Sequence, residues 1–292
     1  MTETIPTSLT LGSARITRIP EFVLDVMAPE RLFPGLDPAS LSDAERKLMT
    51  GAKPDSNTVP LPVHPWLVEW DGRVILIDTG AGNGKSRPFS KFFENLDNPF
   101  LERLALAGIR PEDVDCVLLT HLHVDHIGWN TRLEGAAWVP TFPRARYVFP
   151  ATEMAFFETE AGRPRRALLE DSILPIIAAG QGETIPPEGG TVEGLFSFAP
   201  APGHTAGQMT ISLTSEGQEA LFCADALHNP IQVGRPDLSS VFCVDPATAV
   251  TTRRRLLDYA ADRPVTLLPS HFPGSGAGRV ARGAEGFIWQ PV

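Results

Sequence analysis

The stretch THLHVDHIGWN, residues 120–130, places three histidines and an aspartate within six positions of a chain that has seven histidines in all. Alternate residues of an extended segment point to the same side, so His121 and His123 can hold one metal ion. Asp125 and His126 lie beyond the expected turn and can face a second ion. The stretch therefore predicts a metal site, provided that further ligands converge on it.

Four strand-like segments lead to residues that can bind a metal. In open α/β sheets, functional groups collect beyond the carboxyl ends of strands, because the sheet holds these ends rigidly while the loops converge. The four segments are 115–120, which precedes His121; 195–201, which leads through two residues to His204; 220–224, which precedes Asp225; and 265–270, which precedes His271. We therefore expect an α/β fold with four sets of ligands at one edge.

The candidate ligands are all nitrogen and oxygen donors. Cysteine is absent from the set, which argues against a closed structural zinc site. The seven candidates (His121, His123, Asp125, His126, His204, Asp225 and His271) are more than one tetrahedral ion can use. Two divalent ions that share a carboxylate would use them and still leave positions for water. We expect two ions, with Zn²⁺ favoured and Mn²⁺, Co²⁺, Ni²⁺ or Fe²⁺ as alternatives.

Five short motifs resemble those of the metallo-β-lactamase-fold hydrolases. They are LIDTG at 76–80, THLHVDHIG at 120–128, PGHTAGQ at 202–208, CADAL at 223–227 and SHFPG at 270–274. In order and spacing the match runs from about residue 60 to residue 280. The resemblance implies a four-layered αββα sandwich.

The resemblance also implies a role for each ligand. His121, His123 and His204 would hold one ion, Asp125, His126 and His271 would hold the other, and Asp225 would bridge the two. Asp78 matches the aspartate that steadies the ligand-bearing loop in this family, and such support orients metal ligands.

The branch of the family is indicated by a few positions. Asp125 together with His271 resembles the dinuclear lactonases, arylesterases and organophosphate-hydrolase-like members. True β-lactamases often have cysteine where Asp225 stands. The segments GNGKSRP and GWNTRL resemble a bacterial subgroup that includes a hydrolytic chlorothalonil dehalogenase. Lactonases carry a substrate-contacting tyrosine three residues after the bridging aspartate, but this chain has His228 there.

The predicted function is hydrolysis of a small-molecule ester, lactone or related substrate by a hydroxide that bridges two ions. Two divalent ions lower the pKa of a water held between them, and one ion polarises the oxygen of the attacked group. Asp125 would relay a proton to the leaving group. His228 would hydrogen bond the substrate oxygen or donate a proton.

Other function classes are open on the same fold. A mononuclear iron oxidoreductase resembling persulfide dioxygenases would use two histidines and one aspartate, so the full ligand set weighs against it. A thioester hydrolase of the glyoxalase type is a further alternative, although a C-terminal basic cluster that could grip a glutathione carboxylate is not evident. A binding protein with a vestigial site should have lost ligands, and none is lost.

Composition limits the partners and the compartment. A net charge of -10 disfavours nucleic acid as a partner, because binding to phosphates relies on excess lysine and arginine. No apolar run approaches the roughly 18 residues of a membrane span, and MTETIPTSLT at the N-terminus has no basic leader or apolar core. Cys116, Cys223 and Cys243 are expected as buried free thiols, which suits a cytoplasmic protein.

The chain has no repeat, linker or low-complexity tract, so residues 1–292 are expected as a single domain with 1–60 as an N-terminal extension packed on it. Within the extension, 20–60 is interpreted as a surface segment, with a homodimer contact or an active-site wall as alternatives. We expect helices at 41–49, 99–108 and 252–263, and strands at 63–70 and 73–80.

Several further residues have both a structural and a functional interpretation. Trp129 and Phe272 are expected to pack in the core or to line the pocket. His64 is expected to be structural. A glycine-rich loop carries Lys85 and Arg87, which are expected on a solvated surface, with contact to an anionic substrate as the alternative. The run Arg253–Arg255 is expected on the solvated face of a helix.

Overall fold

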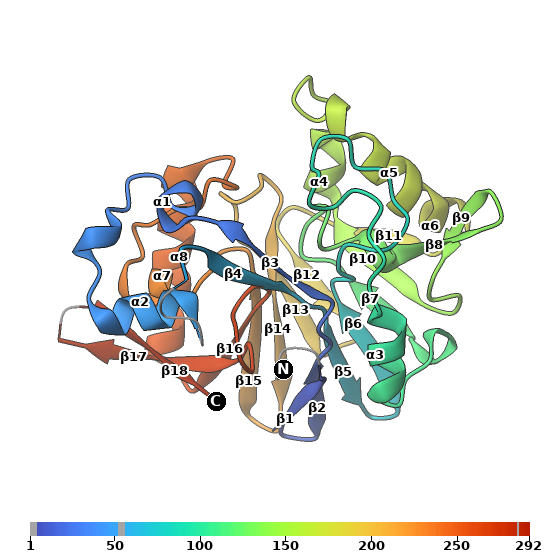
Figure 1. Ribbon diagram of the computed structural model, residues 1–292. Coiled ribbons are helices and arrows are strands. Elements are labelled where there is room, and N and C mark those ends of the chain that lie inside the picture. Colours follow the sequence, from blue (N-terminus) through green and yellow to red (C-terminus); the bar gives the residue numbers. More distant parts are fainter. Residues whose placement is uncertain (1–4, 52–55, 285) are drawn as a thin grey trace.

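Apolar side chains cover both faces of the central strands, as is typical of strands buried between two layers. In the strand Cys116–Leu118, Cys116 and Leu118 pack in the space between two sheets, whereas Val117 packs against helices on the opposite side. The computed structural model describes residues 5–51, 56–284 and 286–292, and it places two facing sheets between outer helices (Figure 1).

The first sheet has seven strands in the order β1-β2-β5-β6-β7-β10-β11. The pairs from β6 to β11 are parallel, and those from β1 to β6 are antiparallel. The bounds are Thr7–Leu11 for β1, Ala14–Arg18 for β2, Trp66–Trp70 for β5, Arg73–Ile77 for β6, Cys116–Leu118 for β7, Arg146–Pro150 for β10 and Gly182–Ile185 for β11. Strands β6 and β7 therefore end at the same edge.

The second sheet also has seven strands, in the order β12-β13-β14-β15-β16-β17-β18. Strands β13 and β15 are both antiparallel to β14, and β15 is parallel to β16, so β13, β15 and β16 run in one direction. The bounds are Gly190–Val192 for β12, Phe196–Pro200 for β13, Met209–Ser215 for β14, Gln218–Ala224 for β15, Val265–Pro269 for β16, Gly278–Gly283 for β17 and Gly286–Pro291 for β18.

Two hairpin-like sheets and short helices complete the fold. Strand β3 (Phe22–Met27) pairs with β4 (Val59–Val63), and β8 (Thr131–Glu134) pairs with β9 (Ala137–Pro140). The α-helices are α1 Pro29–Leu32, α2 Asp43–Thr50, α3 Phe100–Leu106, α4 Ala151–Phe156, α5 Ala167–Ser172, α6 Leu174–Ala178, α7 Ile231–Gly234 and α8 Pro246–Ala261. The 3₁₀ turns are η2 Pro38–Ser40, η3 Pro111–Asp113, η4 Gly128–Asn130 and η5 Arg163–Arg165.

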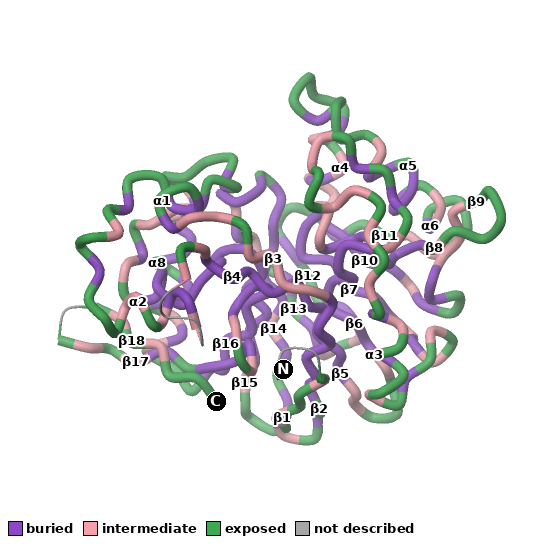
Figure 2. Tube along the Cα trace, viewed as in Figure 1, coloured by how far each residue is buried: buried purple, intermediate pink, exposed green. Residues whose placement is uncertain are grey.

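Three apolar clusters define the layers. The central cluster joins the inner faces of the sheets, for example Ile77 of β6 and Phe222 of β15. A second cluster packs the outer face of the first sheet against α3, α5 and α6, and a third packs the outer face of the second sheet against α8. Buried segments accordingly run through the centre of the molecule in Figure 2, with exposed loops around them. The predicted four-layered αββα sandwich is confirmed.

The predicted helices are present, with shifted ends. Helix α2 begins after Ser42, whose side chain forms a capping box with Glu45. Helix α8 begins at Pro246, six residues before the predicted start at 252, because the Asp245 carboxylate accepts a hydrogen bond from the backbone N–H of Thr248.

The N-terminal segment contributes both to the core and to a separate wall. Residues 7–18 form β1 and β2 within the first sheet, where Ile16 belongs to the central cluster. Strand β3 pairs with β4 outside the two large sheets, and it packs with α1 and α2 around a small apolar cluster that includes Phe33 and Met49. These residues lie within the segment 1–60 that we expected as an extension.

The prediction that Lys85 and Arg87 are solvated is wrong. Both side chains are buried, and both bind Asp171 on α5: Arg87 makes two hydrogen bonds of 2.6 and 2.8 Å to the carboxylate, and Lys85 Nζ lies 3.4 Å from it. Lys85 also donates to Thr131 and covers the ring of Trp138. Burial lowers the pKa of Lys85 to about 8. The glycine-rich composition of the loop concealed this long-range partner.

One residue of the run Arg253–Arg255 also departs from the prediction. Arg254 and Arg255 are exposed, but Arg253 is completely buried and donates to the backbone oxygens of Ala226 and Pro236. Helical periodicity places residue 253 on the face that also carries the buried residues 249, 256, 257 and 260. Arg253 therefore ties α8 to the loop that follows β15.

We predict that Asp171→Asn lowers the free energy of unfolding by about 3 kcal/mol, because it leaves two buried cations without their counter-charge. Asp237→Asn is the matched control, since Asp237 pairs with Arg254 at an exposed position and should contribute under about 1 kcal/mol. Denaturant-induced unfolding of both variants measures the difference. Equal small losses would contradict a structural role for the Asp171 cluster.

Candidate metal centre

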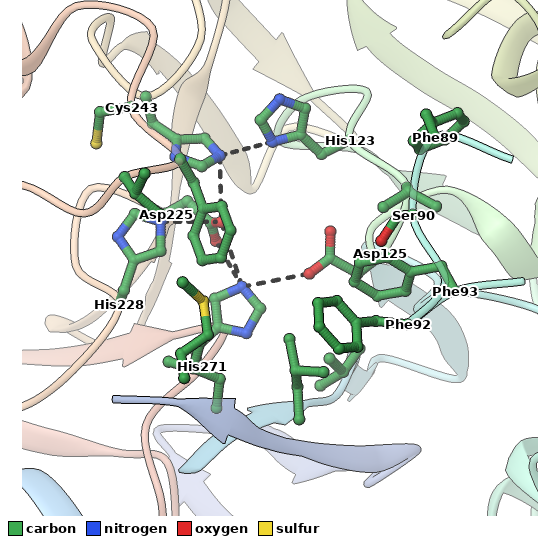
Figure 3. Close-up of a pocket in the computed structure, with 18 of the residues that line it drawn as sticks. Phe89, Ser90, Phe92, Phe93, His123, Asp125, Asp225, His228, Cys243 and His271 are labelled. Carbon is green, nitrogen blue, oxygen red and sulfur yellow. Dashed lines mark hydrogen bonds and ion pairs between the residues drawn. The ribbon is translucent and has the colours of Figure 1, made fainter. Parts of the chain in front are cut away.

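Strand ends from both sheets meet at one site (Figure 3). In the first sheet, Asp78 follows β6 and the segment 121–126 follows β7. In the second sheet, the three strands that share a direction lead to the remaining candidates: β13 to His204, β15 to Asp225 and β16 to His271. The structure thus brings all seven predicted ligands together.

Asp225 lies between two groups of donor atoms. Its Oδ2 is 3.2 Å from His204 Nε2, and its Oδ1 is 3.3 Å from His126 Nε2 and 3.2 Å from His271 Nε2. One group comprises His121, His123, His204 and Asp225, and another comprises Asp125, His126 and His271. A third, His204, His228 and Cys243, shares His204 with the first, and the donor atoms within each group lie within 4.8 Å of one another. Two ligands of a tetrahedral zinc ion are separated by roughly 3.3 Å, so the spacing suits coordination.

Several buried donor atoms in the cluster have no hydrogen-bond partner among the described residues. They are His121 Nε2, His126 Nε2 and Asp225 Oδ1, the last two of which lie 3.3 Å apart as an ion pair that does not form a hydrogen bond. Buried polar atoms are rarely left without a partner, because their desolvation is then uncompensated. Since these atoms belong to a cluster of imidazoles and carboxylates, a divalent cation fits the site.

Asp78 orients two of the histidines. Its carboxylate accepts hydrogen bonds from the backbone N–H and the hydroxyl of Thr120, and it lies 2.8 Å from His126 Nδ1. The Thr120 hydroxyl in turn lies 3.0 Å from His121 Nδ1. The Nε2 atoms of both rings are therefore directed away from this support and toward the cluster.

Two strained backbone positions stand directly at the ligands. Asp78 has φ +58°, and Ala224, which immediately precedes Asp225, has φ +46°. Residues with a side chain rarely adopt this left-handed region, and such strain collects at functional sites because the surrounding structure enforces it. Here it turns the chain sharply at the ends of β6 and β15.

Two buried glutamates that the sequence analysis missed fasten the ligand loops. Glu153 on α4 accepts hydrogen bonds from the backbone N–H of Leu122, at 3.0 Å, and from that of Gly207, at 2.8 Å. It therefore joins the loop of His121 and His123 to the loop of His204. Burial raises the pKa of Glu153, although these N–H donors oppose the shift.

The second glutamate, Glu21, holds the loop after Asp78. It accepts from the backbone N–H groups of Ala81 and Gly82 and from Trp129 Nε1, and burial raises its pKa to about 7. A Cβ atom at Gly128 would lie 1.8 Å from the backbone oxygen of Ala81. The glycine of the histidine motif thus allows this loop to approach the motif closely.

The charge states of the cluster suit cation binding. Burial lowers the pKa of His121, His123 and His204, that of His123 to about 4, so these rings are neutral at pH 7 as metal ligands must be. Burial acts in the same direction on His126 and His271, but nearby carboxylates, Asp225 foremost, raise the pKa of both. A cation would take the place of these protons.

The cluster forms the floor of a cavity of about 520 Å³, a size typical of small-molecule sites. His123, Asp125, His204, Asp225, His228 and His271 line it together with Cys243, Ser90, Arg31 and Arg165. The other lining residues are apolar: Leu24, Val26, Met27, Leu61, Val63, Phe89, Phe92, Phe93, Val124, Leu168, Val241, Phe242 and Val244. Residues from 20–60 thus form a wall of the cavity, the alternative to a surface segment.

Of the remaining candidate residues, one lines the cavity and the others pack in the protein interior. His228 lines the cavity, and its Nε2 lies 3.2 Å from the hydroxyl of Ser240. Trp129 and Phe272 pack in the core, against Phe100 and Trp289 respectively. His64 is buried beside Trp66, outside the donor groups, in keeping with a structural role.

The fold and the site together define a metallohydrolase-type centre, and the family comparison agrees. The model of the metallo-beta-lactamase superfamily matches residues 58–271, which include every candidate ligand. The chain therefore belongs to the metallo-beta-lactamase superfamily, as its motifs indicated.

The known relatives and solved structures that this chain resembles have low sequence identity to it. The N-acyl homoserine lactonase AiiB of Agrobacterium fabrum is 25% identical over 256 residues, which cover 78% of this chain and 86% of that protein. The structure of the hydrolase AbOPH of the beta lactamase superfamily superposes with a TM-score of 0.84 at 24% identity, covering 99% of this chain and 98% of the other. AidC, a dizinc quorum-quenching lactonase, gives 0.78 at 22% identity, with 100% and 99% covered.

These relatives confirm the predicted enzyme class, a metal-dependent hydrolase. The donor cluster likewise supports the binding of divalent metal. No helix within residues 5–51, 56–284 and 286–292 combines the length and apolar character that would let it cross a membrane. Cys116, Cys223 and Cys243 are free and buried, as expected.

We predict that Asp225→Asn weakens metal retention and nearly abolishes turnover. The amide keeps the size of the side chain but loses the charge and one of the two donor oxygens that face the histidine groups. Elemental analysis after gel filtration measures the metal that each chain retains, with Asp237→Asn as an exposed control. Wild-type metal content together with near-native activity would contradict a bridging role.

Proposed function

We propose that this protein is a dinuclear metal-dependent hydrolase that opens lactones or cleaves related esters. One observation carries the proposal: Asp225 stands within 3.3 Å of imidazoles from both donor groups, at the floor of a largely apolar cavity. The retention of all seven donors supports a site that holds two ions, for which zinc is the proposed metal.

The proposed ligand sets follow the two donor groups. His121, His123 and His204 would hold one ion, Asp125, His126 and His271 the other, and Asp225 would be shared. When bound, two divalent ions would supply a water of lowered pKa and would polarise the carbonyl oxygen of the substrate. The protein's own groups then have to position the substrate and move protons.

Asp125 is the proposed proton carrier. It lines the cavity, is partly exposed there, and its carboxylate lies 3.9 Å from His126 Nε2 and 3.7 Å from His271 Nε2. A carboxylate in this place can accept a proton from the attacking water and deliver it to the oxygen of the leaving group. The product would be a carboxylic acid and an alcohol, joined in one molecule if the substrate is a lactone.

His228 is proposed to contact the substrate oxygen. It is buried, and its Nδ1 has no hydrogen-bond partner among the described side chains and backbone groups. Burial lowers the pKa of His228 to about 3, so the ring is neutral at pH 7. Of the two roles that the sequence left open, hydrogen bonding to the substrate fits a neutral ring better than donation of a proton by an imidazolium.

The substrate class is supported by the cavity and by the relatives. Thirteen apolar side chains line the cavity above the donor cluster, which suits a small organic ester or lactone. Relatives at 25–26% identity are named as N-acyl homoserine lactonases. A mononuclear iron oxidoreductase is disfavoured, because such a site would leave four of the seven donors unused.

The cellular location and the oligomeric state of the protein remain predictions. The free buried thiols suit a reducing compartment, so we propose the cytoplasm. A single domain over residues 1–292, with the small-molecule substrate as partner and a homodimer as assembly, completes the proposal.

The deciding experiment assays protein of known metal content against lactones, aryl esters, phosphotriesters and halogenated aromatics. We expect hydrolysis of lactones and aryl esters, loss of activity after chelation, and recovery that follows the binding of about two ions per chain. A single redox-active iron with consumption of oxygen would overturn the proposal, and so would the absence of ester or lactone hydrolysis in protein that holds two zinc ions.

We further predict that His228→Phe lowers kcat by about 10²-fold, since a hydrogen bond that strengthens in the transition state is lost. The metal content should not change, because His228 lies outside the proposed ligand sets. Ser240→Ala, which removes only the hydroxyl beside His228 Nε2, should cause a smaller loss. Steady-state kinetics and metal analysis measure both effects. A His228→Phe enzyme with the wild-type kcat would exclude the proposed contact.

A further inference from the structure

The charged residues that line the cavity fall into two sets. Asp125 and Asp225 belong to the donor cluster, where the histidines and a bound cation would balance their charges. Outside that cluster, the charged side chains that line the cavity are both arginines, Arg31 and Arg165. The chain as a whole has a net charge of -10, so the presence of two arginines at the opening of this cavity contrasts with the overall excess of acidic residues.

The two arginines stand on different walls. Arg31 is on α1, next to the wall formed by β3 and β4, whereas Arg165 ends the turn η5 just before α5. Figure 1 shows α1 and α5 on opposite sides of the molecule, with β3 and β4 between them. Both residues are exposed. An elongated ligand that rises from the cluster would therefore meet a cation at the rim.

Neither guanidinium is engaged within the part of the chain that the structure describes. No hydrogen bond or ion pair joins Arg31 or Arg165 to another described side chain, whereas the adjacent Arg166 pairs with Glu158 and Glu170. Arg165 lines the same cavity as His123 of the donor cluster.

The space between the rim and the floor is apolar. Phe89, Phe92 and Phe93 line it from one side, and Val241, Phe242 and Val244 line it from another. A ligand that reaches from the cluster to the rim would thus bury a hydrocarbon or aromatic body along these side chains. Its far end would then lie at a rim that carries one guanidinium group on each of two walls, and guanidinium groups bind carboxylate, sulfonate and phosphate groups well.

We propose that the substrate is an amphipathic ester or lactone with an anionic group remote from the scissile bond, and that Arg31 and Arg165 select for this group. The nature of the scissile bond rests on the proposed function, but the recognition of an anion at the rim does not. The two arginines are specificity residues and take no part in the reaction. An exposed ion pair contributes modestly, so the expected effects are a few-fold for each residue.

The test uses two fluorescent probes with the same aromatic frame, in protein loaded with zinc. These are 1-anilinonaphthalene-8-sulfonate, which is anionic, and N-phenyl-1-naphthylamine, which is neutral. Arg31→Gln and Arg165→Gln should each raise the Kd of the sulfonate about threefold, and the double variant about tenfold. The Kd of the neutral probe should stay within about twofold, and high salt should reduce the difference between the probes.

Arg163→Gln is the matched control, because Arg163 is exposed on the same turn but does not line the cavity. It should leave the affinity for both probes unchanged. If the double variant binds the sulfonate as tightly as the wild type does, or loses both probes equally, the proposal is overturned.

A kinetic comparison separates this proposal from the proposed function. The substrates are p-nitrophenyl hexanoate and the mono-p-nitrophenyl ester of adipic acid, which differ in a terminal carboxylate. The double variant should raise KM for the adipate ester about tenfold relative to the hexanoate ester, with kcat unchanged for both. If neither these esters nor the lactones of the panel are hydrolysed by protein that holds two zinc ions, but the sulfonate probe still discriminates, the hydrolase proposal fails while anion recognition stands. A KM ratio that does not change overturns the selection of anionic substrates.

Discussion

A single carboxylate buried among imidazoles is the constraint on which the site depends. Burial alone would raise the pKa of Asp225, yet His271, His126 and His204 together lower it far below its usual range. The carboxylate is therefore charged in a place from which water is largely excluded, and its negative charge needs positive charge nearby. The raised pKa of His126 and of His271 favours protons on these rings in the metal-free protein, and divalent cations can provide more positive charge. Asp78, Glu153 and Arg253 form hydrogen bonds to the loops that carry the donors.

The sequence predicted the floor of the site well, for a physical reason. Ligand residues are adjacent to the ends of apolar strand segments, so the pattern of His121 to His126, His204, Asp225 and His271 is local and readable. The four-layered fold followed from the same motifs, and both sheets are present. Local features of the chain, such as the cap of α2 by Ser42, can also be predicted. The start of α8 depends on Pro246 and on the capping Asp245, which lie before the apolar pattern of the helix begins.

The errors and omissions involve partners that are distant in sequence. Lys85 and Arg87 look like solvated loop residues because their counter-charge, Asp171, comes 84 residues after Arg87. Glu21 and Glu153 carry no local signal, since a glutamate beside a strand or in a first helical turn is ordinary; only the folded chain shows that their oxygens receive backbone N–H groups of the ligand loops. Arg253 could have been placed inside by helical periodicity, but three consecutive arginines suggested a uniformly polar face. Long-range pairing therefore sets the limit of inference from the sequence.

The division between floor and walls has a consequence for how such enzymes can diverge. All seven donors lie within residues 58–271, the range that matches the superfamily, whereas β3 and Arg31 lie before it and still shape the mouth of the cavity. Mutations in β3 and α1 can accumulate without moving a donor atom, because these elements carry no donor and pack through a small apolar cluster with α2, β4 and α7. Natural selection can thus retune what enters while the reactive machinery is inherited intact, which is one route by which a single ancestral scaffold gives rise to many substrate ranges.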